Sequence, residues 1–90
     1  MKRVTKCYLK ENTPAPQTLY LPQGAEVVAA AEADGHISLF VITESVPVAN
    51  ELRTFEVHNT DDIINAEKLR HICTYEGATG TKHLLEILMR

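Results

Sequence analysis

The stretch AEVVAAAEADGHISLFVIT, residues 25–43, decides the fold. It consists of two apolar runs that are joined by Asp34 and Gly35. Asp-Gly between two apolar runs is typical of a type I′ β-hairpin, because both turn residues must adopt a positive φ. Two residues in the turn also fix how the strands pair. The sequence therefore predicts two antiparallel strands, 25–33 and 36–43.

The register of this hairpin places Ala29 opposite Phe40 and Val27 opposite Ile42. This face is then largely apolar, and the other face is apolar too, with Val28 opposite Val41. Small alanines allow another sheet, a helix or a subunit to approach closely. We interpret the doubly apolar hairpin as the centre of a barrel or as an oligomer contact, and our candidate interaction surface is Ala29, Ala31, Phe40 and Ile42.

A helix is the alternative for the first half of this stretch, because residues 27–33 are rich in good helix formers. The segment between Gly24 and Gly35 has room for barely three helical turns, which is marginal for an isolated helix. The Asp-Gly turn and the β-rich partner run both favour a strand. We therefore assign a strand.

The rest of the chain reads as further short strands separated by turns rich in Pro, Gly, Asn and Asp. A one- or two-turn helix is expected within residues 59–69, with Ile63, Ile64, Ala66 and Leu69 on its apolar side. The pattern predicts one β-rich domain, residues 1–90, folded as a small antiparallel β-sandwich or barrel of six to seven strands with one short helical insert. The additional strands are expected at 3–10, 17–21, 52–58, 70–76 and 82–89.

The charge balance argues against nucleic-acid binding. Nine Lys and Arg are outnumbered by twelve Asp and Glu, which gives a net charge of −3. Nucleic-acid-binding domains usually carry a basic patch or a basic pI. The first six residues contain no apolar core of a signal peptide, and no apolar run is long enough to span a membrane. With two cysteines, Cys7 and Cys73, we expect a reduced cytoplasmic protein without membrane contact.

Metal binding is not expected, because the possible ligands lack the spacing of a structural zinc site, which takes four ligands, usually in two close pairs. His71 and Cys73 are two residues apart on a predicted strand, so they are expected to face the same way. No second close pair accompanies them. We predict no metal and no cofactor; the residues considered as ligands are Cys7, His36, His58, His71, Cys73 and His83.

The loop 77–82, Gly-Ala-Thr-Gly-Thr-Lys, superficially resembles a phosphate-binding loop. A P-loop has four residues between its glycines and a Lys directly after the second, whereas this loop has two and places Thr81 before Lys82. An ordinary hairpin loop is therefore favoured. A looser role of its backbone amides in anion binding stays open, and the candidate ligand-binding residues are Gly77, Thr79, Gly80 and Lys82.

Catalytic patterns are weak. The chain has no Gly-x-Ser-x-Gly sequence, and its two serines are Ser38 and Ser45. Cys73 could pair with a histidine as nucleophile and base, but no third group to orient the base is evident. The acidic pair at positions 61–62, close to His58, is more typical of a capped turn than of acid–base catalysis. We expect that the protein is not an enzyme.

Several short motifs together resemble a family of small phage- and prophage-encoded proteins of unknown function. They are the turn at 21–25 (Leu-Pro-Gln-Gly-Ala), the hairpin, Arg-Thr-Phe at 53–55 and Ile-Cys-Thr-Tyr at 72–75. The resemblance spans nearly the whole chain. It departs at the C-terminus, where relatives have an aromatic-rich end and this chain has Leu-Leu-Glu-Ile-Leu-Met at 84–89. Phe40 also stands where a Trp is common.

The resemblance implies a phage accessory protein made inside the bacterium, and it transfers no catalytic residue. Our first hypothesis is a non-catalytic interaction protein that binds and modulates a host protein of defence or metabolism, and that forms a homo-oligomer. One alternative is a binding protein for a small nucleotide signal, which would use the 77–82 loop. Another alternative is a minor virion component.

Overall fold

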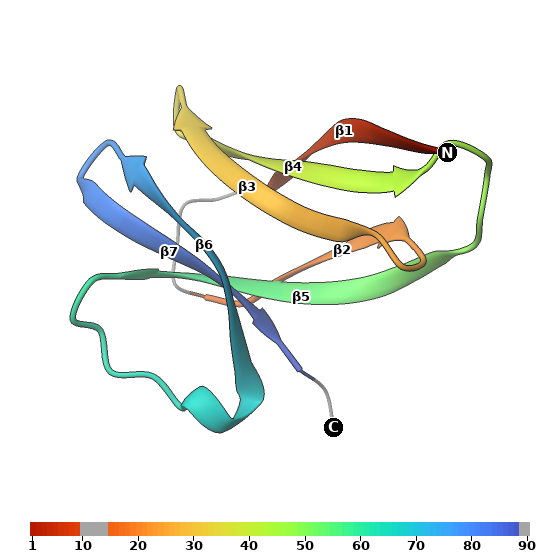
Figure 1. The fold of residues 1–90 in the computed structure, drawn as a ribbon. Helices are drawn as coiled ribbons and strands as arrows, with labels where there is room; N and C mark the ends of the chain where they lie inside the picture. Colours follow the sequence, from red (N-terminus) through yellow and green to blue (C-terminus); the bar gives the residue numbers. More distant parts are fainter. Residues whose placement is uncertain (10–14, 89–90) are drawn as a thin grey trace.

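Seven β-strands make up most of the computed structural model, which describes residues 1–9 and 15–88. They form two antiparallel sheets, one of three strands in the order β1-β4-β3 and one of four in the order β2-β5-β7-β6 (Figure 1). The prediction of a mostly β chain is confirmed at this level. The strands are β1 (Lys2–Leu9), β2 (Gln17–Pro22), β3 (Glu26–Ala33), β4 (His36–Glu44), β5 (Asn50–Asn59), β6 (Leu69–Gly77) and β7 (Gly80–Ile87).

The hairpin between β3 and β4 turns where the sequence predicts it. Asp34 and Gly35 have φ values of 54° and 77°, as a type I′ turn requires. Ala33 pairs with His36, and Ala29 pairs with Phe40. The run of helix-forming residues is a strand here, because its partner β4 supplies the backbone hydrogen bonds and a buried face on which to pack.

The predicted register is wrong beyond Ala29. A β-bulge between Val27 and Ala29 adds one residue to β3, so Val27 pairs with Val41 and not with Ile42. The expected pairing of Val28 with Val41 is wrong for the same reason. The bulge turns Val27 into the core, where it is 7% exposed, and places Glu26 opposite Ile42.

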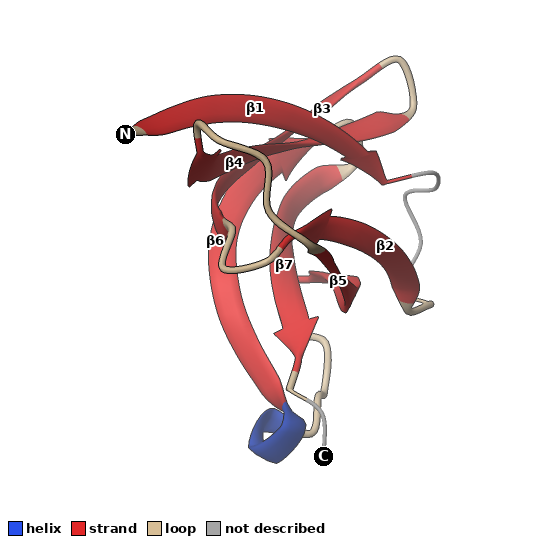
Figure 2. Cartoon of the chain, turned by 90° about the vertical axis from the view of Figure 1, so that its right-hand side faces the viewer, coloured by secondary structure: helices blue, strands red, loops and turns tan. Residues whose placement is uncertain are grey.

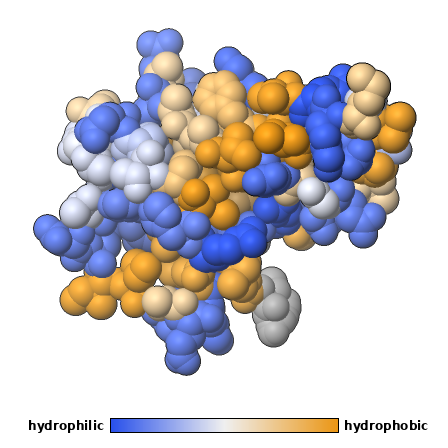
Figure 3. Space-filling model, in the orientation of Figure 1, coloured by the Kyte–Doolittle hydropathy of each residue, from blue (hydrophilic) through white to orange (hydrophobic). Residues whose placement is uncertain are grey.

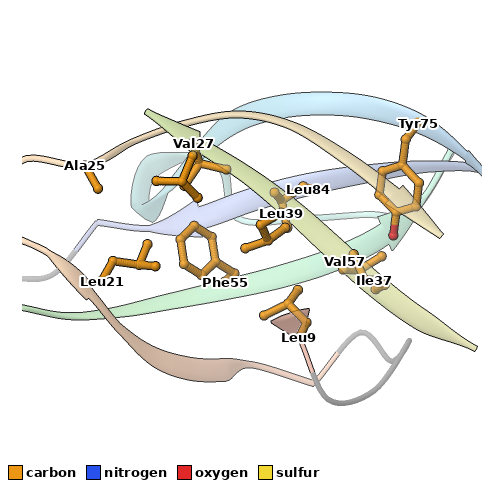
Figure 4. Close-up of a cluster of buried hydrophobic side chains, with 11 residues drawn as sticks. Leu9, Leu21, Ala25, Val27, Ile37, Leu39, Phe55, Val57, Tyr75 and Leu84 are labelled. Atoms are coloured by element: carbon orange, nitrogen blue, oxygen red, sulfur yellow. The ribbon is translucent and has the colours of Figure 1, made fainter. Parts of the chain in front are cut away.

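One hydrophobic core is shared by the two sheets, which face each other in Figures 1 and 2. Alternate residues of each strand point into it, as the two-residue period of a strand requires. Figure 4 shows Phe55 of β5 among side chains from both sheets. Seven of the core side chains are the most completely buried: Leu9, Leu21, Ile37, Leu39, Val41, Phe55 and Leu84.

The expected helical insert is reduced to one 3-10 turn, η1 (Ala66–Lys68). Its start is capped by Asn65, whose side chain accepts a hydrogen bond from the Glu67 amide. The predicted apolar side is wrong, since Ile63 is fully exposed and Leu69 already belongs to β6. The preceding residues are used in a turn, in which Asp61 has a φ of 77°.

The remaining boundaries are close to those predicted. The β6–β7 turn is tighter than expected, because Gly77 pairs with Gly80 and the strand β7 begins there. The C-terminal end of the first predicted strand, most of the loop 11–16 and the residues after 88 lie outside the described part of the chain. Within the described residues, no helix is both long enough and apolar enough to cross a membrane.

Candidate interaction surface

The four residues of the candidate interaction surface lie on one face of the three-stranded sheet. Ile37, Leu39 and Val41 of β4 point into the core, so Phe40 and Ile42 point away from it. Ala29 pairs with Phe40, and Ala31 pairs with Ser38, which brings both alanines to the same outer side.

Strand β1 extends this surface on the other side of β4. Val4 pairs with Ile42, Lys6 with Phe40 and Tyr8 with Ser38, and all three β1 side chains lie on the outer side. Val4 is 67% exposed and Tyr8 is 59% exposed. We call these residues together the β1–β4–β3 face; its members are Val4, Lys6, Tyr8, Ala29, Ala31, Phe40 and Ile42.

This extension could not be found in the sequence, because β1 and β4 are far apart along the chain. The only local signal is the alternation of Val4, Lys6 and Tyr8 with residues that point inward. Figure 3, which views the molecule from its β3 side, shows a hydrophobic area at the centre that is bordered by hydrophilic side chains. On the outer face of the three-stranded sheet, exposed Val4 lies beside Ile42 of the neighbouring strand. A monomer that exposes a contiguous apolar group of this kind commonly uses it as a contact site.

Size and charge both change across the β1–β4–β3 face. The β1 side carries bulky Val4 and Tyr8, whereas β3 carries alanines. The β1 side is also basic: the ammonium of Lys6 lies 5.7 Å from the centre of the Tyr8 ring and 6.0 Å from that of Phe40. Glu26 provides an exposed carboxylate on the β3 side. The face is therefore asymmetric across its width.

The residues of the candidate ligand-binding loop lie close together in the structure, but the side chain of Lys82 is buried. Gly77 and Gly80 close the β6–β7 turn, and Thr79 is exposed. Lys82 is only 8% exposed, and its ammonium donates a hydrogen bond to the side-chain oxygen of Asn59. A hollow of about 560 Å³ remains beside the turn, lined by Asn59, Thr60, Thr79, Gly80, Thr81 and Lys82.

A cluster of polar side chains lies on the outer face of the four-stranded sheet. His58 and His83 pair across β5 and β7. The two rings of His71 and His83 approach to 3.3 Å between Nε2 and Nδ1, and the Thr74 hydroxyl lies 3.0 Å from the same Nδ1. The Thr60 hydroxyl lies 2.9 Å from Nε2 of His83. The Thr60 contact fastens the segment after β5 to the sheet, and the other contacts join β6 to β7.

Asp62, the second residue of the acidic pair near His58, also holds this segment in place. Asp62 accepts a hydrogen bond of 2.9 Å from the amide of Asn59 and lies 3.3 Å from Nδ1 of His58. Glu56 contacts Nε2 of the same ring at 2.6 Å. Asp62 thus closes the turn after β5, whereas the following helical turn is capped by Asn65 and not by the acidic pair.

His71 and Cys73 do not face the same way, contrary to the prediction. A β-bulge between them adds a residue to β6, so His71 pairs with Leu85 while Cys73 pairs with Leu84. Cys73 packs against the core, whereas His71 and His83 are on the outside. A shared metal ion and a Cys–His catalytic pair at Cys73 both lack the geometry. Among residues 1–9 and 15–88, no three His, Cys, Asp or Glu are grouped to hold a metal ion.

Both thiols are partly buried and unpaired. Burial raises the pKa of Cys7, and burial likewise raises the pKa of Cys73 although a backbone hydrogen bond with Ala30 opposes the change. Cys7 lies on β1 of the three-stranded sheet, and Cys73 lies on β6 of the four-stranded sheet. Both thiols are therefore poor thiolate nucleophiles at neutral pH.

A family model described as a domain of unknown function, DUF7352, matches residues 1–87. No match was found among curated proteins, and none among solved structures. Since the family match covers nearly the whole chain, the protein belongs to the DUF7352 family.

Proposed function

We propose that this member of the DUF7352 family is a non-catalytic protein that acts by binding another protein through the β1–β4–β3 face. The observation that carries the proposal is the exposure of apolar side chains on a sheet whose opposite side already forms the core. Tyr8 and Val4 are more than half exposed there, next to the partly buried rings and side chains of β4. Aromatic anchors of this kind dominate the binding energy of many interfaces.

The partner class of this proposal is protein. The resemblance to phage-encoded proteins supports a host protein of defence or metabolism as the partner, with the protein working in the host cytoplasm. The apolar face itself supports a homo-oligomer. Neither of these two arguments depends on a catalytic group. Cys73 and the histidines that were considered as its catalytic partners lie on opposite faces of the four-stranded sheet.

A pull-down from bacterial lysate tests the proposed function. The tagged protein is compared with Ala31→Glu, which places a charge at an exposed position of the face without removing a buried group. Ala78→Glu in the exposed β6–β7 turn is the matched control, because it makes the same change away from the face. We expect protein capture, including capture of an untagged copy of the same chain, to be lost in Ala31→Glu and kept in the control. Equal capture by all three would contradict the proposal.

The hollow beside the β6–β7 turn favours a second candidate function, the binding of a small anionic molecule such as a nucleotide signal. Threonine hydroxyls and backbone amides would be the donors, because the Lys82 ammonium is already bonded to Asn59. A panel of nucleotides in a thermal-unfolding assay tests this function. A rise in Tm with one nucleotide, absent in a Thr79→Val variant, would support it, and no rise with any nucleotide would remove it.

A further inference from the structure

We infer that the partner on the β1–β4–β3 face is a second copy of this chain, related by a twofold axis parallel to β4. This inference rests on the proposed function and identifies its partner. The axis lies between two face-to-face sheets, so each β4 packs on the partner copy's β4 and each β1 packs on the partner copy's β3. Twofold contacts of this isologous kind are the commonest in homo-oligomers.

The sizes of the side chains favour this arrangement. In each copy the β1 side is bulky, and the β3 side carries Ala29 and Ala31, with Val28 partly exposed at the bulge. The axis places Tyr8 of one copy over the region of Ala31 of the other, since both pair with Ser38 in their own sheet. On either side of the axis, large residues of β1 therefore meet alanines of β3, and along the axis Phe40 and Ile42 of β4 meet their own counterparts in the other copy.

The charges favour the same axis. Rotation about an axis parallel to the strands keeps each cross-strand row in place, so Glu26 of one copy faces Val4 of the other, because both pair with Ile42. Lys2 and Lys6 flank Val4 on the same side of β1. Each Glu26 carboxylate is thus placed beside the Lys6 ammonium of the partner copy, whereas the Lys2 ammonium is already paired with Glu44 of its own sheet at 2.7 Å.

The competing twofold axis, perpendicular to the strands, would place β1 on β1. Lys6 would then approach the lysines of the other copy, and the bulky side chains of β1, including Tyr8, would pack against the bulky side chains of the other β1. Like charges that face each other across an interface are unfavourable. The contact between Lys6 and Glu26 therefore favours the axis parallel to β4, while Glu44, which lies near this axis in both copies, is neutralised by its ion pair with Lys2.

A charge-swap experiment tests the inference. Dimer dissociation constants are measured by sedimentation equilibrium for the wild type, Lys6→Glu, Glu26→Lys and the double variant. We expect each single change to weaken the dimer by about tenfold or more, and the double change to restore it to within about threefold. Glu67→Lys in the exposed turn η1 is the control and should leave the constant unchanged. Circular dichroism confirms that each variant is folded.

The single variants also separate a specific contact from a general charge effect, because Lys6→Glu makes the net charge more negative and Glu26→Lys makes it less negative. Weakening by both supports a specific contact. No recovery in the double variant would overturn the inferred axis. If the wild type is a monomer that captures a host protein, and Ala31→Glu loses this capture, the inferred second copy is wrong but the proposed function stands. If the wild type is a monomer that captures no protein, both the inference and the proposed function are wrong.

Discussion

Arg53 of β5 donates two hydrogen bonds to the carboxylate of Glu86 of β7, one of 2.7 Å from Nε to Oε2 and one of 2.8 Å from Nη2 to Oε1. Their side chains are 11% and 9% exposed. Arg70 adds a contact of 3.0 Å to Glu86, and Arg53 also donates to the carbonyl oxygen of Ala25. The pair therefore links three strands of one sheet to the turn that leads into β3 of the other.

Replacing Arg53 with methionine should destabilise the protein by about 3 kcal/mol, because a buried carboxylate loses its bidentate partner. Urea unfolding measures this loss. Arg70→Met is the control: the Arg70 side chain is 57% exposed, so its removal should cost at most about 1 kcal/mol. An equal decrease in the free energy of unfolding in both variants would contradict the prediction that the buried Arg53–Glu86 pair contributes more than the exposed Arg70 contact.

Acid should weaken the fold through Glu86. Burial raises the pKa of Glu86, but its contacts with Arg53 and Arg70 lower it by more, so the pKa lies below its ordinary value. This contribution to stability is therefore present above the unfolded-state pKa of about 4.3 and is lost as the pH falls through the lower folded-state pKa.

The Glu86→Gln variant should lack this part of the pH dependence. Free energies of unfolding at a series of pH values below about 5 should fall less steeply in Glu86→Gln than in the wild type. Glu67→Gln, at an exposed position, should follow the wild type. Parallel curves for the wild type and Glu86→Gln would refute the assignment.

Tyr75 carries a buried hydroxyl that has no hydrogen-bond partner among the described residues. Tyr75→Phe should be neutral or should stabilise the protein by up to about 1 kcal/mol at neutral pH, because an unsatisfied polar group is removed. A loss of more than about 1 kcal/mol in thermal or urea unfolding would mean that the hydroxyl has a partner.

The same substitution should change the alkaline limit of stability. Burial, together with the nearby Glu32 and Cys73, raises the pKa of Tyr75 to about 12. The wild type should therefore lose stability as the pH rises from the unfolded-state pKa of about 10 towards 12, because the unfolded chain ionises first. Tyr75→Phe should not show this part of the loss in unfolding measurements above pH 10.

Gly77 has no room for a side chain. A Cβ at this position would lie 2.5 Å from the Glu32 carboxylate and 2.9 Å from Cγ of Lys82. Gly77→Ala should therefore cost about 1–3 kcal/mol, because both side chains must move. Thr79→Ala in the same turn should change the free energy of unfolding by less than about 0.5 kcal/mol. A neutral Gly77→Ala would mean that Glu32 and Lys82 relocate freely.

The local features of the fold were predictable from the sequence because they depend on neighbouring residues. The turn at Asp34 and Gly35 requires positive φ values, and alternation of apolar residues fixes which side of β5 is buried. The two bulges were not predictable. Each one depends on packing against another strand: Val27 enters the core beside Val41, and Cys73 enters it beside Leu84.

The candidate surface was predicted only in its central part. Ala29 and Phe40 belong to one hairpin, so their common face follows from the turn. Lys6 and Tyr8 joined them through the pairing of β1 with β4, which no local pattern reveals. Glu26 reached the outer side through the bulge. The charge pattern of the face therefore emerged only with the tertiary structure.

The molar mass of the wild-type protein in solution tests the central claim most directly. Light scattering coupled to size-exclusion chromatography, over a range of loading concentrations at moderate salt, should give about twice the chain mass of 10.0 kDa. The mass should fall towards that of one chain in Ala31→Glu. A wild type that stays at 10.0 kDa at every concentration would contradict the claim that the β1–β4–β3 face is closed by a second copy.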